Sequence, residues 1–426
     1  MPAAGRVVVV GQGYVGLPLA MRAAEVGFDV VGFDVDRVRV DRLAEGDSYV
    51  GDIGAARLAA ALTSGRYRPS ADPRDLADFD LAVITVPTPL RDGAPDLSYI
   101  EDAARLLAAH LRAGACVILE STTYPGTTDE LVAPILQEGS GLVPGADFHL
   151  GYSPERINPG DPNATLEGTP KVVSGIDAAS LARVQAFYDE IVVRTVPVSG
   201  TREAELTKLL ENTFRHVNVA LVNELAMFAA DLGIDVWEAI DAADTKPFGF
   251  MRFEPGPGVG GHCLPIDPSY LAWKVRDELG APFRFVELAN DINDFMPEYV
   301  VRRLGAGLHD RGRTLEGARV LLLGLAYKPE TGDAREAPAL RIAERLARLG
   351  ASVRAADPYV VDEVHGLDPA IGLVRVDLDP DEVAAADAVV VVTPHAAFDL
   401  DMVVTHARYV LDTRRRVPAA PNVEHL

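Results

Sequence analysis

The sequence predicts an α/β protein with two Rossmann-like doubly wound domains, joined by a long central helix in a helical dimerisation domain. Three observations support this fold class. At the N-terminus a β-branched run, a glycine-rich turn and a helical pattern follow one another, and a second strand, turn and helix begin near residue 318. Between them, about thirty residues from Glu203 contain neither Gly nor Pro. Strands that alternate with helices predict parallel sheets, and 426 residues are enough for two or three domains.

The composition limits the classes of partner. The formal net charge of −23 argues against a nucleic-acid partner or an anionic membrane surface, although a local basic pocket could still bind an anionic substrate. Two cysteines are too few for a disulfide framework, and Cys116 lies in a strand-like run where a buried small side chain is expected. The sequence has no signal-peptide pattern and no apolar run of about 18 residues. We therefore expect a soluble, cytoplasmic protein.

The N-terminal turn has the pattern of a dinucleotide-binding loop. The strand Arg6 to Val10 runs into a GxGxxG sequence that is followed by a helical pattern. The residues of this turn expected at the cofactor are Gly11, Gly13, Tyr14, Val15 and Gly16. A second strand, Phe28 to Phe33, ends at Asp34, where a carboxylate would bind ribose hydroxyls and repel a 2′-phosphate. We therefore expect NAD rather than NADP, although Arg39 could tolerate a phosphate or stack on adenine, and Asp34 could be an ordinary strand-end cap.

Polar loops follow three further strand-like runs of the first domain. These runs are Leu81 to Val86, Cys116 to Leu119 and His149 to Tyr152. Thr88 and Thr122 follow the first two runs, at the carboxyl edge of a parallel sheet, where ligands bind. The third run precedes the loop SPERINPGD, in which Glu155 and Arg156 are candidates for chemistry and for binding an anion.

The central run from Glu203 predicts a helix on the order of 40 Å long, because each helical residue adds about 1.5 Å. Apolar residues occur nearly all round it between Phe214 and Met227, which predicts burial on several sides, most simply against a second subunit. Lys208, Asn212 and Arg215 share one face of this helix. A lysine, an amide and a guanidinium on one face suggest a substrate-binding surface, and the alternative is a solvated stripe.

The stretch from Gly256 to Tyr270, GPGVGGHCLPIDPSY, combines a single cysteine with four glycines. Glycines leave the backbone uncovered, and Pro257 and Pro265 stiffen the expected loop, so a ligand can approach closely. Cys263 is a candidate nucleophile, and Asp267 is a candidate to orient or deprotonate whatever the sulfur acts on. The alternative is a buried structural cysteine beside a turn.

A second α/β sheet is expected after the helical segment Phe283 to Leu304. The run ARVLLLGLAYKPETGDARE begins with a strand, and further strands are expected at Ala351 to Ala355, Asp387 to Val392 and Tyr409 to Leu411. The turn in this run lacks GxGxxG, so it need not bind a second NAD. Lys328 and Arg335 flank a Gly-Asp turn and are expected to hold a diphosphate, and the alternative is two surface cations.

Seven ordered motifs extend over nearly the full chain: GQGYVGLPLA, VPTP, ESTTYPGTT, SPER, KLLENTFR, GPGVGGHCLPIDP and GLAYKPETGDARE. With these motifs the chain resembles the UDP-sugar 6-dehydrogenases, which oxidise the C6 alcohol of a nucleotide sugar to a carboxylate with two NAD. The resemblance implies an NAD-binding domain over residues 1–200, a helical dimerisation and catalytic domain over 201–305 and a UDP-sugar-binding domain over 306–426. It also implies a UDP-sugar substrate and a homodimer formed through the central helix.

Two positions favour the N-acetylhexosamine branch of that family. His262 follows two glycines, and Ile266 stands where UDP-glucose dehydrogenases usually carry a lysine. The resemblance therefore implies a UDP-N-acetylhexosamine such as UDP-GlcNAc or UDP-ManNAc, with UDP-glucose or dTDP-glucose as the alternative. Two other interpretations are a non-catalytic protein that binds NAD and a nucleotide sugar, and a dehydrogenase that stops after two electrons.

The resemblance also implies a covalent mechanism. Cys263 would attack the aldehyde formed by the first oxidation, and Lys208 and Asn212 would stabilise the thiohemiacetal oxyanion. A second oxidation leaves a thioester, and the residues implied in its hydrolysis are Glu155, Thr122 and Asp267. The residues expected to bind the sugar and the diphosphate are Glu155, Arg156, Lys208, Asn212, Arg215, Arg252, Gly260, Lys328 and Arg335. No metal site is expected.

Overall fold

The chain folds into two compact units. The computed structural model describes residues 5–51, 53–91, 93–157, 165–261, 263–360 and 371–426, without the side chain of Cys263. The first unit contains Met1–Glu211 and Ser269–Leu279, and the second contains Asn212–Pro268 and Gly280–Leu426. Among the described residues, no helix is both long and apolar enough to span a membrane.

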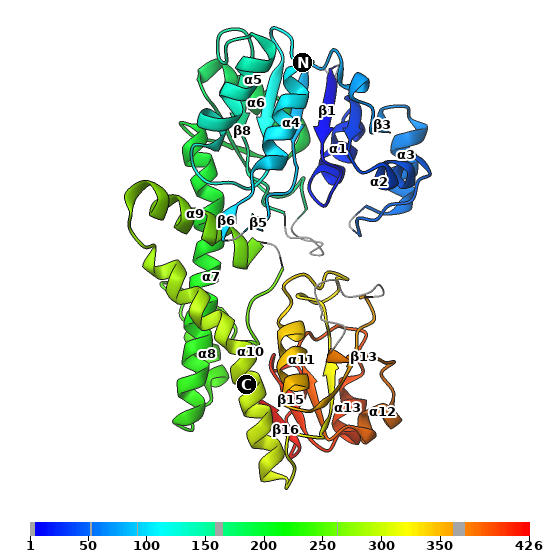
Figure 1. Ribbon diagram of the computed structural model, residues 1–426, viewed down its shortest axis with the longest axis vertical. Coiled ribbons are helices and arrows are strands. Elements are labelled where there is room, and N and C mark those ends of the chain that lie inside the picture. The colour runs from blue at the N-terminus through cyan, green and yellow to red at the C-terminus, as the bar shows by residue number, and fades with distance from the viewer. Residues whose placement is uncertain (1–4, 52, 92, 158–164, 262, 361–370) are drawn as a thin grey trace. The chain divides into compact units, whose positions relative to one another are not determined.

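An eight-stranded sheet forms the centre of the first unit (Figure 1). Its strands are β1 (Arg6–Val10), β2 (Asp29–Phe33), β3 (Tyr67–Ser70), β4 (Leu81–Ile84), β7 (Cys116–Leu119), β8 (His149–Tyr152), β9 (Lys171–Gly175) and β10 (Thr195–Pro197). Their order is β10-β9-β8-β7-β4-β1-β2-β3, and all neighbours are parallel except β8 and β9. The chain winds outward in both directions from β1, which is the doubly wound order that the sequence predicts. A small hairpin, β5 (Leu90–Arg91) and β6 (Ala94–Pro95), lies outside this sheet.

Helices cover both faces of the first sheet because its strands are apolar on both sides. Val7 and Val9 of β1 belong to one core cluster and Val8 and Val10 to another, since alternate strand residues point to opposite faces. The first cluster contains residues of α1 (Gly16–Glu25), α2 (Arg37–Ala44), α3 (Ala55–Thr63) and α6 (Ala178–Ile191). The second contains residues of η1 (Pro73–Leu76), α4 (Ser98–Ala108), η2 (Thr127–Val132) and α5 (Ala133–Ser140).

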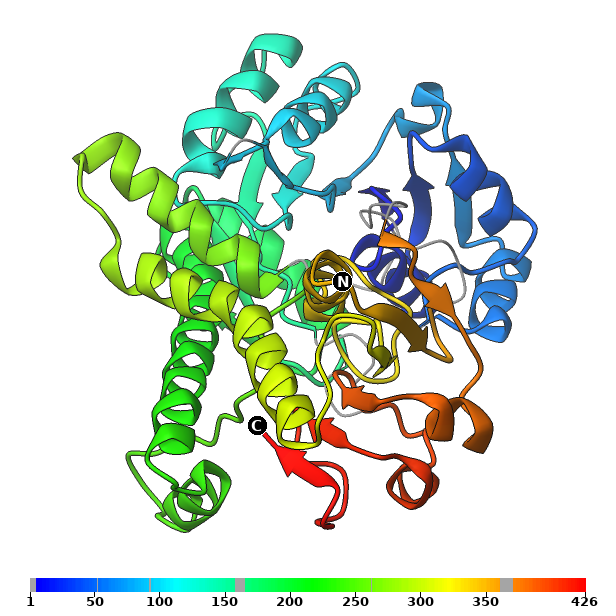
Figure 2. The same ribbon diagram turned by 60° about the horizontal axis from the view of Figure 1, so that its bottom comes forward.

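The predicted central helix is α7, which runs from Thr201 to Asp231 without interruption (Figures 1 and 2). Its 31 residues correspond to about 45 Å. The helix begins in the first unit and continues into the second, because the boundary falls between Glu211 and Asn212. The second unit also contains α8 (Val236–Asp244) and α10 (Arg284–Asp310).

A six-stranded parallel sheet forms the centre of the second unit, with the order β13-β12-β11-β14-β15-β16. Its strands are β11 (Arg319–Leu323), β12 (Ser352–Ala356), β13 (Val374–Arg375), β14 (Ala388–Val391), β15 (Val410–Asp412) and β16 (Val423–His425). One face packs against α10 and α11 (Pro338–Arg348), and the other packs against α12 (Pro380–Ala385) and α13 (Leu400–His406). Figure 2 shows β16, in red, at the edge of this sheet. The second Rossmann-like unit is therefore confirmed.

The structure corrects the expected loop around the cysteine. Only its glycine-rich half is irregular, because α9 begins at Cys263 and extends to Leu279. Pro265 does not prevent this, since the first turn of a helix contains N–H groups that have no partner within the helix. Pro268 lies inside α9 and removes one backbone donor there. The nucleophile candidate is therefore the first residue of a helix rather than the middle of a loop.

Several predicted boundaries also shift. The strand predicted from Phe28 begins at Asp29, and the helix predicted to end at Leu304 continues to Asp310. The strands β3, β5, β6, β9, β10, β13 and β16 have no counterpart in the predicted set. The last two contain only two and three residues, which is too short for a recognisable alternation of apolar and polar residues.

Candidate functional site

The turn after β1 requires glycine at two of the three glycine positions of its GxGxxG sequence. Gly11 has a φ of +94°, and a Cβ there would lie 2.9 Å from the carbonyl oxygen of Thr85. At Gly16, the first residue of α1, a Cβ would lie 1.8 Å from the carbonyl oxygen of Gly11. The turn is therefore tight because any larger residue would separate β1 from α1 and β4.

Gly13 differs from these two glycines because a Cβ there would contact nothing within 4 Å. Space is therefore open in front of this backbone. Val15 precedes α1 without a capping side chain, and the first turn of α1 contains no acidic residue. The start of α1 thus offers N–H groups and the positive end of a helix dipole, which suit the pyrophosphate of a dinucleotide. Tyr14, between these residues, is half-exposed.

Asp34 lies at the end of β2 and is almost fully buried. Its carboxylate accepts hydrogen bonds from the backbone N–H groups of Gln12 and Asp36, both at 2.9 Å. Since a carboxylate has about four acceptor positions, these two bonds leave capacity for ribose hydroxyls. Arg39 lies with its Nη1 3.8 Å from Asp34 and with its guanidinium 5.7 Å from the ring centre of Tyr49. The residues of this unit therefore fit NAD.

Thr88 and Thr122 meet at the carboxyl edge of the first sheet. The Thr88 hydroxyl donates a hydrogen bond of 2.8 Å to the carbonyl oxygen of Thr122. Ser121 strengthens the same connection by donating to Val86, at 2.7 Å. The loops after β4 and β7 are thus linked at the edge where the sequence places them.

Lys208 and Glu155 are brought together in the first unit. Lys208 is buried on α7, and its Nζ donates to the backbone carbonyl of Glu155 at 2.5 Å and lies 3.5 Å from the Glu155 carboxylate. The neighbouring Arg156 points elsewhere. Its guanidinium pairs with both carboxylate oxygens of Glu211, at 2.6 and 3.2 Å, and donates to the carbonyl of Pro170. An anion at Arg156 would therefore have to share this guanidinium with Glu211.

Asn212 connects the second half of α7 to α9 within the second unit. Its Nδ2 donates to the carboxylate of Asp267, and its Oδ1 accepts a hydrogen bond from Arg215. Asn212 and Asp267 are both buried, whereas Arg215 is exposed. Asp267 lies four residues after Cys263 in α9. Asn212 therefore links Arg215 to Asp267 through two hydrogen bonds, and the side chain of Cys263 lies outside the described residues.

The glycine segment before Cys263 packs against the loop from Tyr327 to Glu336, referred to below as the KPETGD loop. A Cβ at Gly260 would lie 2.8 Å from the carbonyl oxygen of Glu336. Gly261 has a φ of +79°, and its N–H donates to the carbonyl of Arg335 at 3.0 Å. Gly260, predicted as a substrate contact, thus has a packing role as well. His262 lies outside the described residues.

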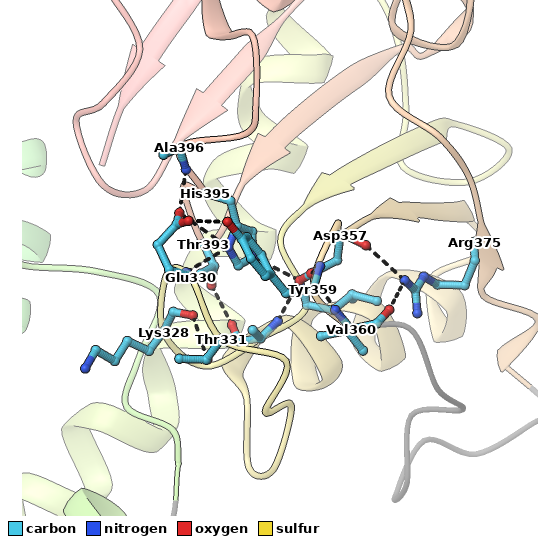
Figure 3. A network of polar contacts seen from close by, with 12 residues as sticks. Lys328, Glu330, Thr331, Asp357, Tyr359, Val360, Arg375, Thr393, His395 and Ala396 are labelled. Carbon is cyan, nitrogen blue, oxygen red and sulfur yellow. Dashed lines mark hydrogen bonds and ion pairs between the residues drawn. The ribbon is translucent and has the colours of Figure 1, made fainter. Parts of the chain in front are cut away.

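Three predicted cations of the second unit have different surroundings. Lys328 is half-buried, and Figure 3 shows its ammonium pointing away from the nearby hydrogen-bonded cluster. Arg335 is exposed and pairs with Asp333 at 2.6 and 2.9 Å. Arg252 pairs with Asp241 at 2.8 Å and with Glu254 at 3.2 Å. Arg252 is therefore held by carboxylates of its own chain.

Arg414, which follows β15, is a further candidate that was not predicted from the sequence. Its Nη1 would lie 2.3 Å from a Cβ at Gly256, so this glycine is needed to admit the guanidinium. Its Nε donates to the carbonyl of Val392 at 3.4 Å, beside the end of β14. Burial lowers the pKa of Arg414 to about 10, and this half-buried cation lies at the carboxyl edge of the second sheet. The signal was present in the run LDTRRRV, which places three arginines directly after a strand.

Cys116 is fully buried in β7, and burial raises the pKa of its thiol to about 12. A thiol in this environment is a poor nucleophile, so the expectation of a structural side chain at Cys116 is confirmed. Among the described residues, no group of three or more His, Cys, Asp or Glu side chains could hold a metal ion.

Comparison with known families gives three successive matches. They are described as the NAD binding domain (residues 5–192), the central domain (residues 202–295) and the UDP binding domain (residues 321–419) of the UDP-glucose/GDP-mannose dehydrogenase family. Together they extend over most of the chain.

Individual relatives agree with these family matches. The chain is 35% identical to a UDP-N-acetyl-D-mannosamine dehydrogenase of Pyrococcus horikoshii over 394 residues, which cover 92% of this chain and 90% of the relative. It is 38% identical to a UDP-N-acetyl-D-glucosamine 6-dehydrogenase of Pseudomonas aeruginosa over 364 residues, with 84% of each chain covered. The solved structure of a UDP-D-ManNAc dehydrogenase of Pyrococcus horikoshii superposes with a TM-score of 0.88 at 34% identity, covering 99% of this chain and 98% of that one.

Proposed function

The chain belongs to the UDP-glucose/GDP-mannose dehydrogenase family, and from this premise we propose that it oxidises the C6 alcohol of a UDP-N-acetylhexosamine to a carboxylate. It is an oxidoreductase with NAD as its cofactor. The two curated relatives described above act on UDP-N-acetyl sugars according to their names, which supports this class of substrate. Ile266 supports it independently, because UDP-glucose dehydrogenases usually carry a lysine there.

The first unit supplies the residues that would hold NAD. Gly13 and the start of α1 face the pyrophosphate, and Asp34 accepts the ribose hydroxyls. The other proposed cofactor contacts are Gly11, Tyr14, Val15, Gly16, Arg39, Thr88 and Thr122. When bound, NAD accepts a hydride in each of the two oxidation steps. The chain itself must therefore manage the protons, the covalent intermediate and the water.

Cys263 is proposed to retain the substrate between the two oxidations. Its thiolate adds to the C6 aldehyde, which forms a C–S bond and turns the carbonyl oxygen into the oxyanion of a thiohemiacetal. Lys208 and Asn212 are proposed to stabilise this oxyanion with N–H donors that are fixed before the reaction begins. The second oxidation restores the C=O bond while the C–S bond remains, and it gives a thioester.

Hydrolysis of the thioester consumes one water and releases the carboxylate and the Cys263 thiolate. We assign Glu155, Asp267 and Thr122 to this step, as groups that position the water or take its proton. The Nζ of Lys208 lies 3.5 Å from the Glu155 carboxylate, so this pair places a donor and an acceptor side by side for the water.

The observation that carries the proposal is the bond between Asn212 and Asp267. It joins the predicted oxyanion donor on α7 to the helix whose first residue is Cys263. The buried amide of Asn212 orients the buried carboxylate of Asp267, which lies four residues after Cys263. This arrangement is suited to thiol chemistry. A protein that only binds NAD and a nucleotide sugar has no need of this arrangement.

Cations of the chain are proposed to bind the sugar diphosphate. The residues concerned are Arg156, Arg215, Arg252, Lys328, Arg335 and, from the structure, Arg414. Arg414 is the strongest of these candidates in the second unit, because it is half-buried and its guanidinium is close to Gly256. A cation in such a place gains more from a phosphate than a solvated one does.

We also propose a homodimer formed through α7. Its exposed apolar residues are spaced by three, four and seven, and they include Phe214, Leu221, Leu225 and Phe228. Leu221, Leu225 and Phe228 have exposed fractions of 52%, 47% and 55%. A helix face of this kind is suited to packing against the same face of a second copy.

The test is a panel of UDP-GlcNAc, UDP-ManNAc, UDP-GalNAc, UDP-glucose and dTDP-glucose, with NADH production measured by absorbance. We expect two NADH per sugar, and the highest kcat/KM with a UDP-N-acetylhexosamine. One NADH per sugar would identify an enzyme that stops at the aldehyde, and no NADH would favour a binding protein. A preference for UDP-glucose or dTDP-glucose would retain the mechanism and reject the proposed branch.

A further inference from the structure

The second sheet repeats the strand, glycine and carboxylate arrangement of the first. Gly324 follows β11 with a positive φ, and its N–H donates to the last residue of the neighbouring strand, as the N–H of Gly11 does. Asp357 follows β12 and accepts the N–H of Leu325, just as Asp34 follows β2 and accepts the N–H after Gly11. Asp357 is therefore the counterpart of the carboxylate that faces the ribose in the first unit.

Asp357 has no acceptor capacity left for a ribose. Five donors reach its two oxygens: the backbone N–H groups of Leu325, Ala326, Tyr359 and Val360, and the ring Nε2 of His395. Burial raises the pKa of Asp357, but these hydrogen bonds outweigh it and keep the pKa well below its usual range. The carboxylate is thus a permanent anion that serves its own chain (Figure 3).

The contact between Glu330 and His395 fixes the tautomer of the imidazole. Nδ1 of His395 lies 3.1 Å from the backbone nitrogen of Glu330, and Nε2 lies 3.1 Å from the Asp357 carboxylate. A backbone N–H can only donate, so Nδ1 must be the acceptor and Nε2 must carry the proton. His395 is buried between the rings of Tyr359 and Phe398, with ring centres 4.9 and 5.3 Å away. Its orientation is therefore set from three sides.

Glu330 is the residue that His395 holds. It has a φ of +60°, which is unfavourable for any residue with a Cβ and needs support from its surroundings. Its carboxylate accepts the N–H of Ala396 at 2.6 Å and the hydroxyl of Tyr359. Together with the bond to His395, these contacts attach the KPETGD loop to the carboxyl edge of the second sheet.

The attachment lies two residues from Lys328. The hydroxyl of Thr331 donates to the carbonyl of Lys328 at 3.1 Å, which closes the turn between Lys328 and Glu330. Figure 3 shows the Lys328 side chain on the opposite side of this turn from His395. The far end of the loop has a separate support, because the backbone carbonyl of Arg335 accepts the N–H of Gly261. The turn and the cysteine segment can therefore be disturbed separately.

We propose that His395 is a positioning residue for nucleotide binding: its neutral ring, oriented by Asp357, holds Glu330 and so presents Lys328 to the diphosphate. The inference rests on the proposed function, in which Lys328 binds that diphosphate. The contact exists before and after the chemical step, so its loss should weaken ground-state binding and leave the chemistry nearly unchanged.

The test compares two substitutions that each keep half of the imidazole's contacts. His395→Asn keeps an acceptor on Cγ, where Nδ1 stands, and His395→Gln keeps a donor near the position of Nε2. We expect His395→Gln to raise the Kd for UDP and the KM for the best sugar about five-fold, the effect of one net hydrogen bond, with kcat changed by less than about two-fold. His395→Asn should keep most of the UDP affinity of the unchanged protein. The KM for NAD should stay the same in both variants.

Two further variants complete the test. Tyr359→Phe removes only the hydroxyl that donates to the Glu330 carboxylate from a partly exposed ring, so it tests a second support of Glu330 if the His395 variants fold poorly. It should raise the Kd for UDP about two- to five-fold. In a Lys328→Ala background, His395→Gln should have no further effect on UDP binding, because it acts through Lys328.

Three results would overturn the proposal: equal loss of UDP affinity in His395→Asn and His395→Gln, an effect of His395→Gln that is unchanged by Lys328→Ala, or a parallel rise in the KM for NAD. Each of these would mean that the cluster supports the fold alone. The Kd for UDP is measured by titration calorimetry. If the unchanged protein does not bind UDP in this measurement, the proposed function itself fails, and this outcome is distinct from the other three.

Discussion

At the scale of single residues, the position of Cys263 at the start of α9 matters for its chemistry. The proposed mechanism needs a thiolate at this residue, and the first N–H groups of a helix and its dipole are in general favourable to a negative charge. Cys116, buried in a strand, has the opposite environment, and the pKa of its thiol is raised to about 12. The two cysteines of the chain therefore have different expected reactivities.

Cys263→Ser should abolish the production of two NADH per sugar and leave the binding of NAD and UDP nearly unchanged. The reason is that a serine hydroxyl is far harder to ionise than a thiol near neutral pH. Stopped-flow absorbance measures NADH per active site, and calorimetry measures both affinities. The matched control is Cys116→Ala, which should retain full turnover. Full turnover in Cys263→Ser would exclude the covalent mechanism.

Asp34→Asn removes the charge of this residue and keeps one of its two backbone hydrogen bonds. The amide oxygen can still accept the N–H of Gln12, which holds the turn after β1, while the bond from the N–H of Asp36 is lost. Without the negative charge, the 2′-phosphate of NADP is no longer repelled. We expect the preference for NAD over NADP, measured as the ratio of the two kcat/KM values, to fall by about ten-fold, which is on the order of the interaction between two partly solvated charges. An unchanged ratio would show that Asp34 is only a strand-end cap.

At the scale of elements, α7 carries residues with different proposed roles on one face. Lys208→Ala and Asn212→Ala each remove a donor to the developing oxyanion, so kcat should fall by about 10² to 10³ with a smaller change in KM. Arg215→Ala should raise KM more than it lowers kcat, because a guanidinium that binds the diphosphate acts equally in the ground state. Steady-state kinetics with the best sugar measures both constants.

Asn218→Ala is the control for this series, since the Asn218 amide donates to Phe214 of the same helix. It should change neither constant. If Lys208→Ala kept its kcat, the shared face would have only a structural role, and the catalytic assignment would be wrong.

The first half of α7 also contains Glu205, a buried carboxyl that sequence analysis did not single out. It accepts the N–H of Gly126 at 2.6 Å and both the N–H and the hydroxyl of Thr128, at 2.9 and 2.7 Å. It thus attaches α7 to the end of the loop that begins with Thr122. Burial raises the pKa of Glu205 to about 7, and the three hydrogen bonds only partly oppose this effect.

This raised pKa predicts a pH-dependent stability. The folded state favours the protonated carboxyl, so the contribution of Glu205 is complete below its unfolded pKa and is lost as the pH rises through about 7. Between pH 5 and 7 the free energy of unfolding should therefore fall by about 1.4 kcal/mol per pH unit from this group, on the order of 2 to 3 kcal/mol in all.

Glu205→Gln should remove this slope, whatever it does to the stability at one pH. Glu203→Gln is the matched control, because Glu203 is exposed on the same turn of α7 and its substitution should leave the slope unchanged. Urea unfolding at pH 5, 6, 7 and 8 measures the slope in all three proteins. Equal slopes for the unchanged protein and Glu205→Gln would contradict the prediction.

At the scale of the whole molecule, local patterns were predictable and distant pairings were not. The turn after β1 and the length of α7 are determined by residues close in sequence, namely glycines at fixed spacing and a long run without Gly or Pro. Glu205, His395 and Arg414 were missed because their partners lie far away in sequence: Thr128 is 77 residues from Glu205, and Asp357 is 38 from His395. A single glutamate or histidine in a sequence does not indicate which distant backbone it will meet. The start of α9 at Cys263 was missed for another reason, because two prolines suggested a loop.

Assembly is the property of the whole molecule that the exposed face of α7 predicts. In a single chain, Leu221, Leu225 and Phe228 of α7 are exposed to water as an apolar stripe. Burying each of these side chains fully would contribute about 1.5 to 3 kcal/mol to the free energy of association. We therefore expect a homodimer in light scattering.

Leu225→Asp should dissociate the dimer or raise its Kd by at least about 10², because a carboxylate in the middle of the interface loses its hydration without gaining a partner. Leu349→Asp is the matched control, since Leu349 has a similar exposed fraction of 51% but follows α11 instead of lying on α7, and the dimer should persist. A monomer for the unchanged protein, or an unchanged dimer for Leu225→Asp, would show that α7 does not form the interface.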